Sequence, residues 1–276
     1  MSNKTAVGKA AATKRGTGRT AEAKLADLRV RLAEISDLNG AGALLTWDQA
    51  TYMPPGGSAV RARQGATLSR LAHEKFTDPE IGRLLDSLTV YADGLPKDSD
   101  DAALIRVTRR DYDKAAKVPA AFVARMTEVG SASYDAWTRA RPANDFATMR
   151  PYLEQMLDLS RQYAGYLGPY RHIADPLIDG PDEGMTVASV RALFSELRAA
   201  LVPMVRAVAT QPVADDSCLR RAFPEDRQLA LGLQAIRRFG YDFARGRLDK
   251  THHPFCTKFG PGDVRITTRV KESDFG

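Results

Sequence analysis

The sequence predicts a mainly α-helical protein with a small β-sheet near the C-terminal end. Apolar residues recur every three or four positions through most of residues 25–238, and this spacing places them on one face of a helix. Clusters of proline and glycine separate these segments. Strict alternation of apolar and polar residues, typical of a strand, is convincing only at residues 264–270.

Residues 1–24 form a basic segment unlike the rest of the chain. They hold six Lys and Arg residues and one acidic residue, a net charge of +5, so the total of +6 leaves only +1 for the other 252 residues. The segment has almost no large apolar side chains, and we therefore predict a disordered tail. A polyanion-binding arm and an organelle transit peptide are the alternatives. Because the body is nearly neutral, no nucleic-acid partner is expected.

The first half of the body predicts a series of helices with recognisable starts. Thr20 is a candidate cap for the first helix, and Thr77 or Asp78 could cap a later one that has Pro79 in its first turn. Residues 98–117 are polar and charged and predict an exposed helix. Pro119 opens the next helix, and Asp145 caps another, in which Pro151 either falls in the first turn or causes a kink.

Residues 166–184 interrupt this pattern with glycine and proline and predict a loop, the best candidate for a hinge between sub-domains. Thr186 then caps a strongly amphipathic helix. Its apolar stripe consists of Val187, Val190, Leu193, Phe194, Leu197 and Leu201. Phe223-Pro224 begins the last helix, which ends at Gly240.

The strand at residues 264–270 offers chemistry on its polar face. Arg265 and Arg269 share this face with Thr267, and Asp263 continues it. A planar guanidinium can bind a carboxylate through two parallel hydrogen bonds, and Asp263 could orient Arg265 for this purpose. The alternative is an ordinary salt-bridged strand face without a ligand.

The histidines and cysteines do not predict a metal site within this chain. Adjacent His252 and His253 point in different directions, so they are poorly placed to share one metal. His73-Glu74 lacks a second histidine at the required spacing, and no His-Glu-x-x-His occurs in the 276 residues. The two cysteines, Cys218 and Cys256, give no disulfide framework and suit a reducing compartment.

Several short motifs occur in a fixed order along residues 25–276. They are Leu44–Gln49 with Met53-Pro54, Asp179-Gly180, Glu183–Thr186, Gly246–Asp249, His253-Pro254-Phe255, and Asp-x-Arg-x-Thr at Asp263, Arg265 and Thr267. Together they resemble the carboxypeptidase Taq family of zinc metallocarboxypeptidases. Each motif is weak alone, and the ordered set is strong.

The resemblance implies a mostly helical, cleft-bearing fold, a homodimer and a cytoplasmic enzyme that removes single residues from peptide C-termini. It also implies zinc or cobalt, held by the His-Glu-x-x-His helix and a later Glu. Because that motif is absent here, we expect residues 25–276 to be the N-terminal part of such a domain. On this view the chain has no catalytic residue or metal ligand of its own, and alone it binds no metal and is inactive.

By the resemblance, only four residues transfer to this chain as substrate-binding or site-supporting groups: His253, Asp263, Arg265 and Thr267. Such a fragment should also expose apolar surface that packs on the remaining half. The alternative is a non-enzymatic helical protein that binds peptides or dimerises to regulate another chain. No membrane association is expected, because no apolar run approaches the ~18 residues that span a bilayer.

Overall fold

The computed structural model describes residues 19–273, so most of the basic segment predicted at 1–24 lies outside the described residues. Helix α1 (Ala21–Thr51) begins directly after Thr20, whose hydroxyl accepts a hydrogen bond from the Ala23 N–H at 3.2 Å. The sequence-predicted cap is therefore present. Residues 21–24, counted with the tail above, belong to the first turn of α1.

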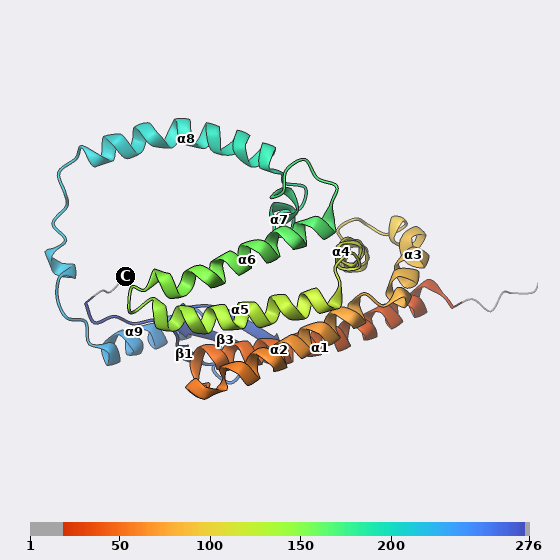
Figure 1. Cartoon of the computed structure of the whole chain (residues 1–276), viewed down its shortest axis with the longest axis horizontal. Coiled ribbons are helices and arrows are strands. Elements are labelled where there is room, and N and C mark those ends of the chain that lie inside the picture. The colour runs from red at the N-terminus through yellow and green to blue at the C-terminus, as the bar shows by residue number, and fades with distance from the viewer. Residues whose placement is uncertain (1–18, 274–276) are drawn as a thin grey trace, which may run out of the picture.

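Four helices form the main bundle, in which α1 packs on α2 (Ser58–Phe76), α2 on α5 (Ala120–Ala140), and α5 on α6 (Phe146–Leu167). Figure 1 shows these helices side by side. Pro119 precedes α5, and the Asp145 carboxylate accepts a hydrogen bond from the Thr148 N–H at 3.1 Å to cap α6. Pro151 lies inside α6, beyond its first turn. A short 3₁₀ helix, Pro55–Gly57, joins α1 to α2.

Helices α3 (Pro79–Asp93) and α4 (Asp100–Ala115) pack on each other, and α3 also packs on α1. Asp78 caps α3 and Pro79 occupies its first turn, as predicted. The helix expected at residues 98–117 is present, but it is not wholly exposed, because Ile105 is buried. The core shared by these helices contains Leu25, Leu28, Ile35, Ile81, Leu84, Leu85, Leu88 and Ile105.

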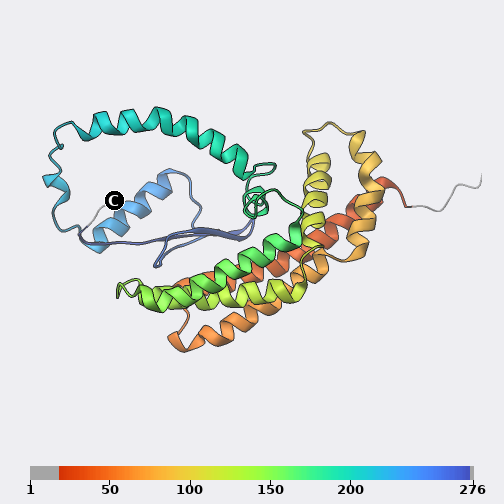
Figure 2. The same ribbon diagram turned by 45° about the horizontal axis from the view of Figure 1, so that its top comes forward.

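Helix α8 (Val187–Ala209) follows the short α7 (Asp175–Asp179) and stands apart from the bundle (Figures 1 and 2). Its start is well defined, since Thr186 and Ser189 form a capping box. None of its residues is buried, and Phe194 and Met204 are 59% and 62% exposed. The apolar stripe predicted from the sequence is therefore present on α8 but uncovered. The hinge predicted at residues 166–184 coincides with α7 and its flanking loops and stays a prediction.

The chain closes with a 3₁₀ turn (Ser217–Leu219), α9 (Glu225–Arg238) and a three-stranded sheet. Gly240 follows α9 with a φ of +84°, a left-handed conformation that glycine adopts without strain. The strands are β1 (Leu248–Lys250), β2 (Cys256–Gly260) and β3 (Asp263–Thr268), in the order β1-β3-β2. Strand β3 pairs in parallel with β1 and antiparallel with β2.

The strand predicted at residues 264–270 thus starts one residue too late and ends two residues too late. Strand β3 ends at Thr268, so Arg269 lies beyond it and is not part of the Arg265 strand face. The predicted class, mainly helical with a small sheet near the C-terminal end, is confirmed. Within residues 19–273, no helix combines the length and apolar character needed to cross a bilayer.

The core of α1 gives a direct test of this packing. Leu28 is fully buried, whereas Val30, two residues along the same helix, is 60% exposed. We expect Leu28→Ala to lower the free energy of unfolding by about 2–5 kcal/mol, because it leaves a cavity. Val30→Ala should change it by no more than about 0.5 kcal/mol. Urea denaturation of both variants provides the comparison, and equal losses would contradict the assigned packing.

Candidate functional site

The polar face of the sheet packs against the C-terminal end of α1. Asp249 of β1 is paired in register with Thr267 of β3, so both side chains lie on this face, and both residues are buried. Thr251, just after β1, donates a hydrogen bond from its hydroxyl to the Ala50 carbonyl of α1 at 3.0 Å. The middle of this face is therefore covered by the helix rather than open to solvent.

Arg265 is held by a carboxylate on its own strand and by two aromatic rings. Its Nε and Nη2 donate to the two carboxylate oxygens of Asp263 at 2.9 and 2.7 Å. Its guanidinium carbon lies 4.2 Å from the centre of the Trp47 ring and 4.9 Å from that of Phe259. The Arg265 side chain is only 18% exposed. The hydrogen bond from Arg265 holds the pKa of Asp263 below its ordinary value.

Thr267 joins the two signature motifs to each other. Its hydroxyl oxygen accepts a hydrogen bond from the Phe255 N–H at 2.7 Å, and its own N–H donates to the Phe255 carbonyl at 2.9 Å. Phe255 ends the His-Pro-Phe segment, so this segment is fixed to β3 at that point. The structure thus gives Thr267 a positioning contact within the protein.

A second arginine cluster on the same face lies within the Gly246–Asp249 motif, whose residues were not among the four predicted site residues. Arg247 donates from Nε and Nη2 to Asp249, each at 2.7 Å, and Nη2 also donates to the Tyr52 hydroxyl at 3.0 Å. Tyr52 in turn donates to Asp249, and this hydrogen bond raises the pKa of Tyr52. Arg247 also lies 5.4 Å from the centre of the Trp47 ring. The Arg-x-Asp spacing at Arg247 and Asp249, at the start of β1, mirrors the Asp-x-Arg spacing in β3, and this symmetry was a signal available in the sequence.

His253 lies away from these charge clusters, on a cavity of about 300 Å³ between α1, α2 and α5. Gln49 and Ser131 cross this region with hydrogen bonds of 3.0 and 3.2 Å. The Tyr134 hydroxyl and the Arg61 Nε are buried without a hydrogen-bond partner among the described residues. The full lining is Leu45, Thr46, Gln49, Ala50, Arg61, Gly65, Thr127, Gly130, Ser131, Tyr134, His253 and Phe255.

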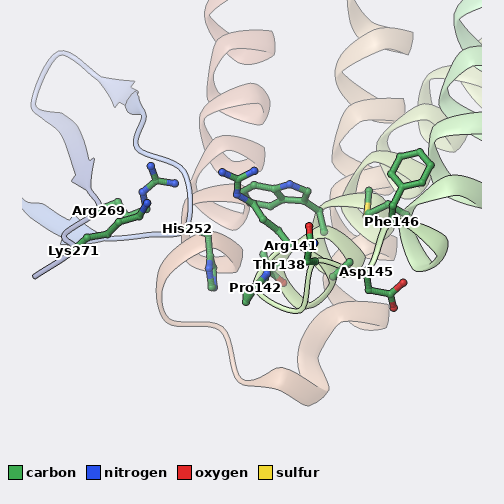
Figure 3. Close-up of a pocket in the computed structure, with 12 residues that line it drawn as sticks. Thr138, Arg141, Pro142, Asp145, Phe146, His252, Arg269 and Lys271 are labelled. Carbon is green, nitrogen blue, oxygen red and sulfur yellow. The ribbon is translucent and has the colours of Figure 1, made fainter. Parts of the chain in front are cut away.

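His252 faces a different cavity, of about 570 Å³, at the junction of α5, α6 and the segment after β3 (Figure 3). Its ring meets Trp137 edge to face, with the ring centres 6.5 Å apart. The Arg141 guanidinium lies 5.9 Å from the centre of the same Trp137 ring. The two adjacent histidines therefore point to separate cavities, as their spacing predicted.

No group of three or more His, Cys, Asp or Glu side chains within residues 19–273 is placed to hold a metal ion. Cys218 and Cys256 are both unpaired and exposed. The residues described therefore do not fit a zinc or cobalt site, and no reaction step can be assigned to a metal from them.

Comparison with known proteins identifies the family. Residues 27–276 match the family described as carboxypeptidase Taq (M32) metallopeptidase. The chain belongs to this family. It is 35% identical over 257 residues to carboxypeptidase 1 of Bacillus subtilis, covering 93% of this chain and 50% of that protein. It is 36% identical over 268 residues to thermostable carboxypeptidase 1 of Thermus thermophilus, covering 93% and 52%.

Solved structures of M32 carboxypeptidases share the fold of this chain. The crystal structure of a protein named BsuCP superposes with a TM-score of 0.86 at 34% identity. The M32 carboxypeptidase from Deinococcus radiodurans superposes with a TM-score of 0.74 at 46% identity. Each comparison covers 91% of this chain and 50% of the other chain. This M32 chain therefore spans about half the length of the relatives it matches.

Removal of the Thr267 hydroxyl should loosen the His-Pro-Phe segment. We expect Thr267→Val to lower the free energy of unfolding by about 1–3 kcal/mol, because the partly buried Phe255 N–H loses its partner. Thr268→Val is the matched control, since no hydrogen bond of the Thr268 side chain occurs within residues 19–273. Urea denaturation and amide hydrogen exchange at residues 253–256 measure both effects. Equal behaviour of the two variants would show that the Thr267 contact is unimportant.

The Asp263–Arg265 pair predicts a pH-dependent contribution to stability. The pKa of Asp263 is lowered in the folded state, so its contribution is complete above the unfolded pKa of about 3.9 and is lost as pH falls through the folded value. The stability difference between wild type and Asp263→Asn should therefore be constant from pH 7 to about pH 5 and shrink below about pH 4. Urea midpoints across this range measure it.

The control for this experiment is Asp182→Asn, because no salt bridge of Asp182 occurs within the described residues. Its difference from wild type should be small throughout the pH series. A difference for Asp263→Asn that persists unchanged at pH 3 would exclude the ionised pair as its source.

Proposed function

We propose that this chain forms one part of a metallocarboxypeptidase that releases single residues from the C-termini of peptides. The observation that carries the proposal is the family match over residues 27–276, together with relatives named as carboxypeptidases at 35% and 36% identity. The ordered His-Pro-Phe and Asp-x-Arg-x-Thr motifs support it, because Thr267 ties one to the other.

We propose that the metal ligands come from polypeptide corresponding to the other half of the relatives, and that the chain alone is inactive. Two observations support this division. The relatives are about twice as long as the matched region, and residues 19–273 hold no suitable ligand cluster. By resemblance the metal is zinc or cobalt, and the assembled enzyme is a cytoplasmic homodimer.

Within this chain, we assign a positioning role to the strand motif. Asp263 engages one edge of the Arg265 guanidinium, through Nε and Nη2, and Trp47 and Phe259 contact its faces, which leaves mainly Nη1 for a substrate. Asp263 and Arg265 therefore fix β3 against α1, and Thr267 fixes the His-Pro-Phe segment. His253 lines the cavity of about 300 Å³, and we propose that it contacts the peptide there.

The uncovered stripe of α8 supports the same division. Leu193, Phe194, Leu197 and Leu201 are 43–59% exposed, and exposed apolar surface of this extent marks a contact surface. We propose that this face packs on the remaining half of the enzyme.

A second candidate is a non-enzymatic protein that binds peptides or dimerises with another chain to regulate it. The uncovered α8 stripe also favours this function, since a partner chain could cover it. The intact mass of the native protein in its source cells separates the two candidates. A mass near 30.2 kDa favours the regulator, and about twice that mass favours the enzyme.

Complementation tests the enzymatic proposal. This chain, with zinc or cobalt supplied, should release no C-terminal residue from a blocked tripeptide. The half of the Deinococcus radiodurans enzyme that matches this chain is 46% identical to it. Addition of the other half of that enzyme should restore hydrolysis. Amino-acid release by mass spectrometry is the measurement, and the two halves of the Deinococcus enzyme are the positive control.

Each arm has a result that would count against the proposal. Hydrolysis by this chain alone, with one bound zinc per chain, would show that the metal ligands lie within it. An active Deinococcus pair beside an inactive hybrid pair would argue against the enzymatic role and in favour of the regulator.

A further inference from the structure

The cavity beside His252 gathers positive charge that no ion pair between described residues neutralises. Arg141, Arg269 and Lys271 all line it, and none of them forms a salt bridge within residues 19–273. Asp145 is the one carboxylate in the lining, and it is committed to the start of α6. Its oxygens accept hydrogen bonds from the Thr148 N–H at 3.1 Å and the Thr148 hydroxyl at 2.6 Å. The three cations and one carboxylate give the lining a formal charge of +2.

The cations reach the cavity from two elements that are far apart in the sequence. Arg141 extends from the C-terminal end of α5, whereas Arg269 and Lys271 come from the segment after β3, with His252 between the two sides (Figure 3). Arg141 lies over the face of Trp137, and this contact leaves the edge of the guanidinium free to donate hydrogen bonds.

The remaining lining is apolar, and it lies next to the charges. Trp137, Phe146 and Met149 form this part of the wall, and Phe146 is 66% exposed. The volume of about 570 Å³ falls within the range of small-ligand sites. A ligand that fits both parts has a compact planar anion attached to an apolar group.

We propose that this cavity is a subsite for a peptide carboxylate, bound by Arg141 and Arg269 with Lys271, while the neighbouring side chain contacts Trp137 and Phe146. The inference rests on the proposed function, because that function makes the ligand a peptide. It adds a site outside the Asp-x-Arg-x-Thr motif, whose Arg265 is already engaged by Asp263. The carboxylate comes from the peptide C-terminus or from an acidic side chain.

Three short peptides distinguish these sources. Acetyl-Ala-Ala-Phe carries a terminal carboxylate, acetyl-Glu-Ala-Phe-amide carries only a side-chain carboxylate, and acetyl-Ala-Ala-Phe-amide carries none. The chain has two tryptophans, and Trp47 is buried, so a change in fluorescence on binding reports on Trp137. We expect saturable binding of one or both acids, weakened by salt because the cations are exposed. The neutral amide should bind at least about tenfold more weakly.

Variants then locate the site. Arg141→Gln and Arg269→Gln should each weaken binding of the acid by about tenfold, the loss of one charge-assisted hydrogen bond. Arg125→Gln is the matched control, because it removes the same charge from an exposed position of α5 outside the cavity. Its affinity should stay within about twofold of wild type. Calorimetric titration gives the affinities, and thermal melts confirm that each variant is folded.

The proposal is overturned if no acid binds at millimolar concentration, if the neutral amide binds as tightly as the acids, or if Arg141→Gln and Arg125→Gln behave alike. These titrations need no turnover, so they fail or succeed independently of the complementation assay. An active hybrid enzyme without carboxylate binding here would refute the subsite alone. Binding here with an inactive hybrid would refute the enzymatic role and leave the subsite in place.

Discussion

The contact of two arginines with one buried tryptophan is the interaction on which the candidate site depends. Trp47, near the end of α1, is 5% exposed, and the guanidinium groups of Arg247 and Arg265 lie 5.4 and 4.2 Å from its ring centre. Arg247 directly precedes β1, and Arg265 lies within β3. A sheet whose strands have three to six residues is too small to be stable alone, so its attachment to α1 fixes its place in the fold.

That attachment places charged groups in a partly buried interface, where Asp249 and Arg265 are only 3% and 18% exposed, and burial of a charge is costly unless it has a partner. Both arginines find the partner two residues away on the same side of the chain, Asp263 for Arg265 and Asp249 for Arg247. Because each ion pair forms between residues two apart, each arginine is already paired with a carboxylate of its own segment where it contacts the helix. The Trp47 Nε1 at the centre of this contact is buried without a hydrogen-bond partner among the described residues.

Much of this fold could be predicted from the sequence where the cause is local. Thr20, Asp78, Asp145 and Thr186 each bond to an N–H two or three residues ahead, so they identify helix starts without knowledge of the fold. Strands β1 and β2 were missed because their hydrogen bonds come from β3. The motif residues of the site were found through resemblance, whereas the link from Arg247 to Tyr52 spans 195 residues and had no local signal.

The attachment of the sheet to α1 also determines where both histidines point. Thr251 is bonded to α1 through the Ala50 carbonyl, and Phe255 is bonded to Thr267 of β3, so the intervening segment is fixed at both ends. His252 and His253 lie between these anchors and line separate cavities. The geometry of either cavity therefore depends on how β3 sits on α1. A residue such as Arg265 can influence the shape of both cavities without lining either of them, because it holds β3 against α1.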